Sequence, residues 1–161
     1  MYETLLTEAQ KENVDVAEIP FLRVKGLYCE KVIGIRKNLT TAEKACVLAE
    51  ELGHYHTSAG NILDQKQLVN RKQENKARRW GYERLVPLDK LIDTFNAGVQ
   101  NRHELIEFLD VAEEFLQEAL KHHQKKYGKA CQVGSYVVCF EPLMVFRRLK
   151  VQKQERWRGK W

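Results

Sequence analysis

The sequence predicts a mainly helical α+β protein, and three observations support this fold class. The chain has 161 residues, 43% of them hydrophobic and 30% charged, which suits a globular protein with a real core. Apolar residues recur at three- and four-residue steps along most of its length, as in amphipathic helices. Short runs of β-branched and aromatic residues, separated by turn residues, predict a small antiparallel β-sheet.

The N-terminal third of the chain predicts a helix followed by a hairpin. Residues 1–13 are expected to be helical because three apolar side chains fall on one face, namely Leu5, Leu6 and Ala9. An extended region begins at residues 19–20. Two short strands are expected at residues 27–29 and 32–35, joined as a hairpin through residues 30–31.

Two longer helices are expected in the middle of the chain. Thr40 and Glu43 have the spacing of a capping box, with Thr40 as the N-cap and Glu43 as the third helical residue. The helix that they open is expected to end at about Tyr55. The next helix is expected over residues 71–85, and Pro87 terminates it.

The rest of the chain predicts helices and then strands. Three helices are expected, over residues 88–97, 102–109 and 111–127. Asp110 is expected to be the N-cap of the last of them. Two helices joined by such a tight turn are typical of a helix-turn-helix motif. Residues 135–140 and 144–146 predict a short hairpin.

The helix-turn-helix pattern has two interpretations, namely DNA recognition and a small helical subdomain that packs on the rest of the protein. The second helix of the pattern has three carboxylates near its start, at Glu113, Glu114 and Glu118. A recognition helix contacts bases and phosphates with its N-terminal residues. Because acidic side chains repel phosphates, we favour the packing interpretation.

The charge of the chain is uneven. The formal net charge is +5, and the segment from Arg147 to Trp161 is strongly basic, with Trp157 also in it. Such a tail can contact nucleic acid or an acidic partner, or it can be a solvated chain end. DNA is therefore a possible partner but not the favoured one.

Targeting and membrane signals are missing from the sequence. No apolar run approaches the roughly 18 residues of a membrane span. The N-terminus lacks the basic start and the apolar stretch of a signal peptide. We therefore expect a cytoplasmic protein without a membrane partner. Its four cysteines lack C-x-x-C spacing, so in a reducing compartment we expect small core residues rather than bridges or ligands.

The run Glu50-Glu51-Leu52-Gly53-His54 differs by one residue from H-E-x-x-H. In that helical motif, two His one turn apart bind a metal and the Glu activates a water molecule. Here Glu51 and His54 stand at the positions of the Glu and the second His, and Glu50 replaces the first His. Residues i and i+4 share a helix face, so Glu50 and His54 can bind one ion, with Glu51 at its rim as the catalytic base.

A third metal ligand is expected from the next helix. Glu74 is the best candidate, twenty positions after His54. Ala77 and Gly81 are small, and Gly53 has no side chain, so the two helices can pack closely.

The resulting ligand set would be one imidazole and two carboxylates, from His54, Glu50 and Glu74. It leaves a position open for water, as catalytic metal sites do. His56 is a less favoured substitute ligand. His56 follows His54 by two residues, so in a continuous helix the two side chains point in nearly opposite directions. His56 could reach the site only if the helix ended before it.

Most of the chain resembles the ImmA/IrrE family of metallopeptidases, which are found in phages and integrated mobile elements of bacteria. The resemblance rests on residues 26–29, 42–54, Asp64 and 71–80, and on residues 102–128, which resemble the helical region after the peptidase core. It implies a zincin-like, zinc-dependent endopeptidase that cleaves a helix-turn-helix phage repressor and releases the element from dormancy. By position, it implies His54 as a metal ligand, Glu51 as the general base and Glu74 as the third ligand.

Three segments follow from this resemblance. We expect a metallopeptidase-like core at residues 1–87 and a helix-turn-helix-like helical subdomain at 88–130. Short β segments and the basic tail follow at 131–161, and the three can pack as one domain.

Glu50 is the departure from the family pattern. A carboxylate is a harder ligand than imidazole, so the metal is Zn²⁺ or another, harder divalent ion. Its negative charge also makes a bound water less acidic. Two alternatives stay open: a catalytically impaired binding module that acts on a repressor stoichiometrically, and a DNA-binding regulator.

Overall fold

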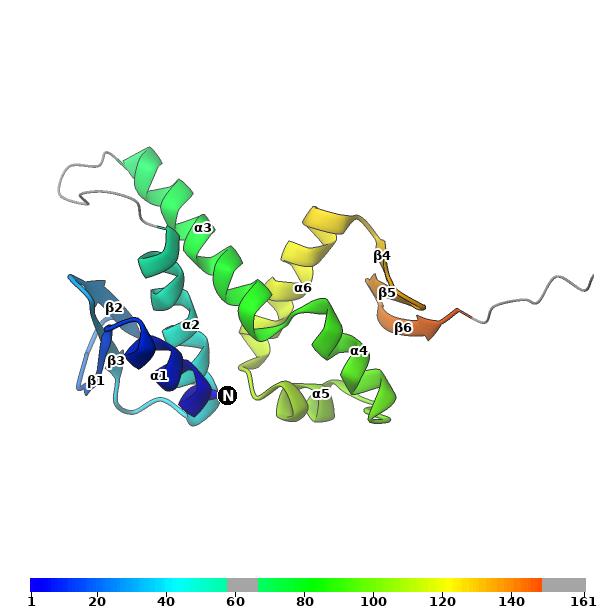
Figure 1. Cartoon of the computed structure of the whole chain (residues 1–161), viewed down its shortest axis with the longest axis horizontal. Coiled ribbons are helices and arrows are strands. Elements are labelled where there is room, and N and C mark those ends of the chain that lie inside the picture. The colour runs from blue at the N-terminus through cyan, green and yellow to red at the C-terminus, as the bar shows by residue number, and fades with distance from the viewer. Residues whose placement is uncertain (58–66, 149–161) are drawn as a thin grey trace, which may run out of the picture.

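The computed structural model describes residues 1–57 and 67–148, and the side chains of all of these except residues 67–70. It confirms an α+β protein (Figure 1). The helices are α1 (Tyr2–Lys11), α2 (Thr41–Thr57), α3 (Gln67–Leu85), α4 (Leu88–Asn96), α5 (Arg102–Leu109) and α6 (Glu113–Tyr127). The strands are β1 (Asp15–Ile19), β2 (Gly26–Cys29), β3 (Val32–Arg36), β4 (Ala130–Val133), β5 (Tyr136–Phe140) and β6 (Leu143–Arg147).

The first sheet has the strand order β1-β3-β2. The predicted hairpin is confirmed, because β2 pairs antiparallel with β3 and Tyr28 faces Ile33 across it. The sheet is not wholly antiparallel, since β1 adds a strand parallel to β3. Strand β1 was not predicted. Only its last residue lies in the expected extended region, and buried and exposed side chains do not alternate regularly along it.

The capping box at the start of α2 is confirmed. The Thr40 backbone amide donates to Glu43 Oε2 over 2.9 Å, and the Glu43 amide donates to Thr40 Oγ1 over 3.3 Å. Each partner satisfies a donor that the first helical turn leaves open. The helix continues two residues past the predicted end, to Thr57.

Helices α2 and α3 touch through small residues, as predicted. A Cβ atom added at Gly53 would lie 2.2 Å from the carbonyl oxygen of Ala77, which is an impossible distance. A Cβ atom added at Gly81 would lie 3.3 Å from the Ala49 backbone. The two backbones are therefore closer than ordinary side chains allow, and the residues beside Gly53 and Ala77 are brought together.

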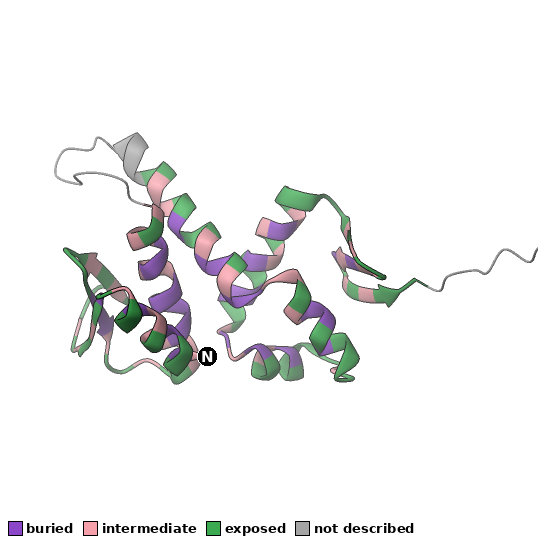
Figure 2. Ribbon diagram, in the orientation of Figure 1, coloured by how far each residue is buried: buried purple, intermediate pink, exposed green. Residues whose placement is uncertain are grey.

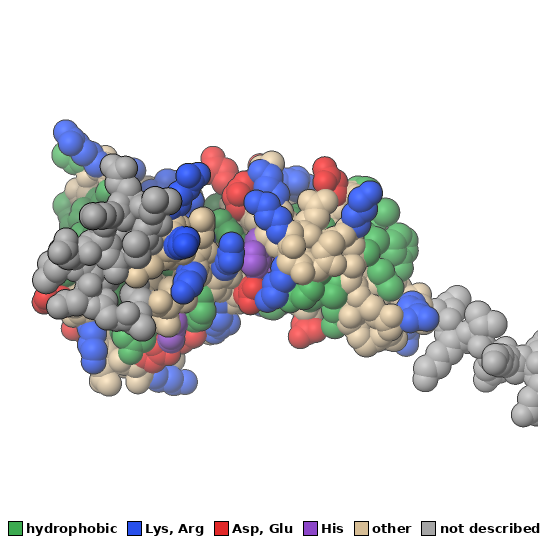
Figure 3. Space-filling view, turned by 90° about the horizontal axis from the view of Figure 1, so that it is seen from above, with side chains coloured by type: hydrophobic (Ala, Val, Ile, Leu, Met, Phe, Trp, Pro, Cys, Tyr) green, Lys and Arg blue, Asp and Glu red, His purple; other side chains and the backbone are tan. Residues whose placement is uncertain are grey.

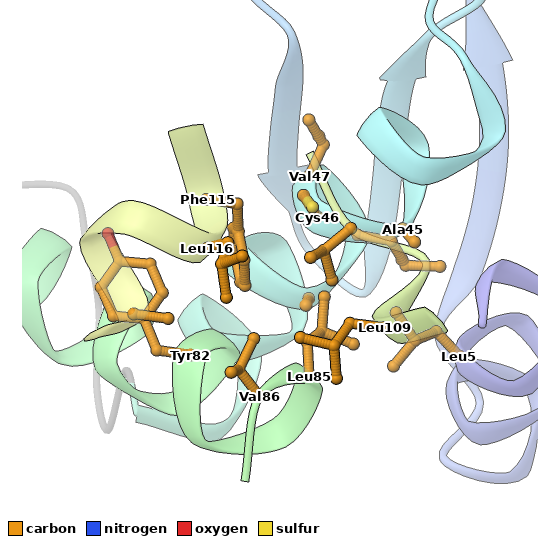
Figure 4. Close-up of a cluster of buried hydrophobic side chains, with 14 of the residues drawn as sticks. Leu5, Ala45, Cys46, Val47, Tyr82, Leu85, Val86, Leu109, Phe115 and Leu116 are labelled. Atoms are coloured by element: carbon orange, nitrogen blue, oxygen red, sulfur yellow. The ribbon is translucent and has the colours of Figure 1, made fainter. Parts of the chain in front are cut away.

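The C-terminal helices share one core with the N-terminal half. The buried cluster runs from Tyr2 in α1 to Phe140 in β5. Figure 4 shows Leu5, Leu85 and Leu109 meeting in it, from α1, α3 and α5. Figure 2 shows the buried faces of the helices turned inward and their outer faces exposed.

The turn between α5 and α6 differs from the prediction. Asp110 is the C-cap of α5 and not the N-cap of α6, which is Ala112. Asp110 has φ 54° and ψ 52°, a left-handed conformation that Asp adopts more readily than most residues. Its carboxylate instead binds the N-terminal ammonium of Met1 over 2.9 Å.

The second sheet has the order β4-β5-β6 and is antiparallel throughout. The predicted hairpin of β5 and β6 is confirmed, whereas β4 was not predicted. Residues 149–161, which include Trp157 and Trp161, lie outside the described residues. In the described parts of the chain, none of the helices has both the length and the apolar character needed to cross a bilayer.

His123 is buried where α6 meets the end of α3 and β5. Its Nε2–H donates to the Val86 carbonyl oxygen over 2.7 Å, and its ring stacks against Phe140. Its Nδ1 is buried and has no partner among the described residues. Burial lowers the pKa of His123, the hydrogen bond to Val86 opposes this change, and the neighbouring His122 adds to it.

Replacing Gly53 with alanine should destabilise the protein. The new methyl group would collide with the Ala77 carbonyl and push α2 from α3, which we expect to lower the free energy of unfolding by about 3 kcal/mol. Gly81→Ala is the matched control. Its contact is looser and alanine favours a helix, so we expect a change within about 1 kcal/mol. Urea unfolding measures both, and equal losses would contradict the close contact at Gly53.

The lowered pKa of the buried His123 should make the free energy of unfolding decrease in mild acid. The unfolded chain, with an ordinary His pKa near 6.5, takes up a proton that the folded chain resists, so stability falls as the pH drops below about 6.5, by up to about 1.4 kcal/mol per pH unit. His123→Gln keeps a donor for Val86 but removes the titration. Urea unfolding between pH 7.5 and 5 should show a shallower slope for this variant, and identical slopes would contradict the assignment.

Candidate metal centre

The candidate ligands and base lie on one well-anchored helix. Leu48 and Leu52 of α2 are fully buried and fix its orientation on the core. Glu50 and His54, four residues apart, therefore extend on a different side, and both are half-buried. Glu51 lies next to them under strand β2.

The structure brings His54 and Glu74 together across the contact between α2 and α3. His54 Nε2 lies 3.2 Å from Glu74 Oε2. The other carboxylate oxygen, Oε1, forms an ion pair with Arg78 Nη2 at a distance of 3.0 Å. His54 directly follows Gly53, and Glu74 lies three residues before Ala77, so this pair depends on the close approach of the two backbones.

The separation of these two donor atoms fits a shared metal ion. Ligands of a tetrahedral zinc ion at bond lengths of about 2.0–2.1 Å lie about 3.3 Å from each other. The 3.2 Å between His54 Nε2 and Glu74 Oε2 matches that value. An imidazole nitrogen and a carboxylate oxygen are also donor types that zinc accepts.

Glu50 lies near this pair but not in its immediate contact. The described residues contain one group of three ligand-type side chains with donor atoms within 4.8 Å of one another, and it does not include Glu50. Glu50 instead lines a cavity of about 280 Å³, with Lys25, Arg78 and Tyr82. Burial raises the pKa of Glu50, the Arg78 charge lowers it, and the Glu74 charge raises it again.

Glu51 has the environment of a poised base. Burial, followed by the charges of Glu50 and Glu74, raises the pKa of its carboxyl to about 7, against a backbone hydrogen bond from Tyr28. Strand β2 lies directly over it, because a Cβ atom at Gly26 would be 2.6 Å from Glu51 Oε1. A carboxyl with a pKa near neutrality can exchange protons at physiological pH.

His56 has other partners. Its Nε2 lies 3.3 Å from Oε2 of Glu12, the C-cap residue of α1, and its ring stacks on Trp80 with a centroid distance of 4.5 Å. The helix continues past His56, so the early helix end that its substitute role needs does not occur. His56, Glu12 and Glu8 form the group within 4.8 Å mentioned above.

Sequence reasoning missed two residues of the site and could have found one of them. Arg78 could have been found, because its i,i+4 spacing from Glu74 indicates the ion pair that the structure shows. Lys25 precedes β2 and is far from α2 in the sequence, so no local signal relates it to Glu50. Asp64, part of the family resemblance, lies outside the described residues.

A larger cavity of about 590 Å³ lies between α3 and α6. Figure 3 shows Lys and Arg side chains gathered on this upper face of the molecule. Several of these cations are already paired, since Lys126 binds Glu83 and Lys121 binds Glu118, each over 2.6 Å. The cavity keeps a net positive charge even so, because five Lys or Arg side chains line it against two carboxylates.

Comparison with known proteins agrees with this geometry. The family model of the IrrE N-terminal-like domain, the M78 peptidases, matches residues 4–121. No curated protein and no solved structure was found to match. The matched range spans α1 to most of α6 and includes every residue of the candidate metal centre. The chain thus belongs to the M78 peptidase family of IrrE N-terminal-like domains.

Proposed function

We propose that this protein is a metal-dependent endopeptidase whose metal is held between α2 and α3. The single observation that best supports this is the 3.2 Å separation of His54 Nε2 and Glu74 Oε2. Glu51, a carboxyl with a pKa raised to about 7, lies one turn back on the same helix as His54. The M78 family supports the same class of activity.

Each residue of the candidate metal centre would have a separate role in catalysis. His54 and Glu74 would hold the ion, and Glu50 is the third candidate ligand. Bound there, Zn²⁺ or another divalent ion supplies a Lewis acid for the peptide carbonyl and for water. Glu51 would take a proton from the attacking water and return it to the leaving amine. Arg78 would position Glu74 through the ion pair at its other oxygen.

The substrate that we propose is a helix-turn-helix repressor of a phage or mobile element, as the ImmA/IrrE resemblance implies. On this proposal residues 1–87 form a zincin-like core, and the helix-turn-helix-like pair α5–α6 supports it. Leu109 and Leu116 of that pair are fully buried in the common core. At the start of α6, Glu113 forms an ion pair with Arg102 at 2.9 Å, which occupies an arginine that could otherwise contact a phosphate.

A second candidate is a binding module that acts on the repressor without cleaving it. Two observations favour it, namely the position of the Glu50 carboxylate and the ion pair of the Glu74 carboxylate. Glu50 replaces an imidazole and is not within 4.8 Å of both His54 and Glu74. Glu74 in turn shares its charge with Arg78. Both features weaken metal binding relative to a site with two His.

Glu51→Gln and His54→Gln separate the two candidates. The enzyme proposal predicts that Glu51→Gln lowers kcat for repressor cleavage by at least about a hundredfold with the bound metal unchanged, because a general base contributes about 10²–10⁴-fold. His54→Gln should lose activity together with the metal equivalent held between α2 and α3. Glu107→Gln, an exposed carboxylate on α5, is the control and should behave as wild type.

The readouts are elemental analysis of protein purified without chelators and gel-based cleavage of the cognate repressor. Wild-type protein that binds the repressor, does not cleave it and holds no metal equivalent that His54→Gln removes would overturn the enzyme proposal in favour of the binding module. Cleavage by Glu51→Gln at the wild-type rate would remove Glu51 as the base.

A further inference from the structure

We propose that Glu8, Glu12 and His56 form a second divalent-cation site, separate from the candidate metal centre, that ties α1 to α2. The donor atoms of these three side chains all lie within 4.8 Å of one another. Two carboxylates and one imidazole are a ligand set that zinc accepts, with a fourth position left for water. The inference does not depend on the proposed peptidase activity.

The two elements supply the ligands at a spacing that suits one ion. Glu8 lies in the last turns of α1 and Glu12 is the C-cap of this helix, four residues later, so that both side chains can extend on the same side. His56 lies in the last turn of α2, opposite that face. Small adjustments of flexible Glu side chains suffice to bring donor atoms within 4.8 Å to the roughly 3.3 Å of a tetrahedral set.

An unsatisfied buried atom points to a ligand at this place. The Oε2 atom of Glu12 is shielded from solvent and has no hydrogen-bond partner among the described residues, whereas the side chain as a whole is 30% exposed. His56 Nε2 lies 3.3 Å from it, but without the geometry of a hydrogen bond. A buried carboxylate oxygen left in this state is costly, and a cation between it and the imidazole nitrogen would satisfy both.

Aromatic neighbours hold the His56 ring in place. Trp80 of α3 stacks on it at a centroid distance of 4.5 Å and an interplanar angle of 24°. Tyr55 packs edge-on against it at 5.1 Å. The ring is therefore oriented with Nε2 toward Glu12, and a ligand that is held in advance loses little freedom when it binds.

Arg84 sets the strength of this site. Its guanidinium binds Glu8 Oε2 over 2.6 Å and so competes with a cation for that carboxylate. With Arg84 in place, two carboxylates and one guanidinium leave the site one negative charge when His56 is neutral. A divalent cation is therefore still attracted, and removing Arg84 should increase its affinity.

The test uses Zn²⁺ as the probe and the full chain, purified without chelators. Equilibrium dialysis with elemental analysis should show that Glu12→Gln binds one equivalent of zinc fewer than wild type, or binds it at least about tenfold more weakly. Saturating zinc should raise the melting temperature of wild type by about 5–10 °C, and Glu12→Gln should lose the share of this shift due to the second site. Arg84→Gln should bind the same equivalent more tightly.

Two comparisons make the result decisive. Glu3→Gln removes an exposed carboxylate from the same helix and should bind zinc as wild type does. His54→Gln tests the other site: if it keeps all its zinc while Glu12→Gln loses one equivalent, the second site stands and the proposed metal centre falls. If Glu12→Gln proves unfolded without metal, Glu8→Gln replaces it. Glu12→Gln or Glu8→Gln that is folded and binds zinc like Glu3→Gln would overturn the proposal.

Discussion

The contact between the backbones of α2 and α3 is the constraint on which the rest of the structure depends. Gly53 lies against the Ala77 carbonyl with no room for a methyl group, and Gly81 lies against Ala49 more loosely. This contact fixes the distance between the helices, and so it decides that His54 meets Glu74. Leu85, at the end of α3, is part of the buried cluster that contains side chains of both the N-terminal and the C-terminal helices. The site needs such an approach, because its two candidate ligands His54 and Glu74 lie on different helices.

Helix α2 sends its two histidines to different neighbours. Residues two apart on a helix point about 200° from each other, so His54 and His56 cannot serve one ion. His54 contacts Glu74 of α3, whereas His56 contacts Glu12 at the C-terminal end of α1 and stacks on Trp80. The same helix thereby contributes one imidazole to each of two carboxylate-containing clusters. We propose a catalytic ion at the first and a structural ion at the second.

Short sequence patterns correctly predicted those parts of the fold that depend on residues close together in the sequence. The capping box at Thr40 and Glu43, the hairpin of β2 and β3, and the small residues between α2 and α3 all follow from short-range patterns, and the structure confirms them. Long-range partners explain the failures. Strand β1 exists because β3 pairs with it, and Asp110 binds the distant N-terminus of Met1 instead of capping α6. In the site, the pairing of His54 and Glu74 agrees with the predicted ligands, and their metal-binding roles stay predictions. The partners of Glu50 and His56 could not be predicted, because they belong to elements distant in the sequence.

The central claim is that α2 and α3 hold one metal ion between His54 and Glu74. Anomalous diffraction at the zinc absorption edge, from crystals of the full chain grown with Zn²⁺, tests it most directly. The account predicts an anomalous peak within about 2.0–2.2 Å of both His54 Nε2 and a Glu74 carboxylate oxygen, with Glu50 turned toward it. A zinc-saturated crystal with no peak between these two residues, and with Glu74 still held by Arg78 and His54 alone, would contradict it.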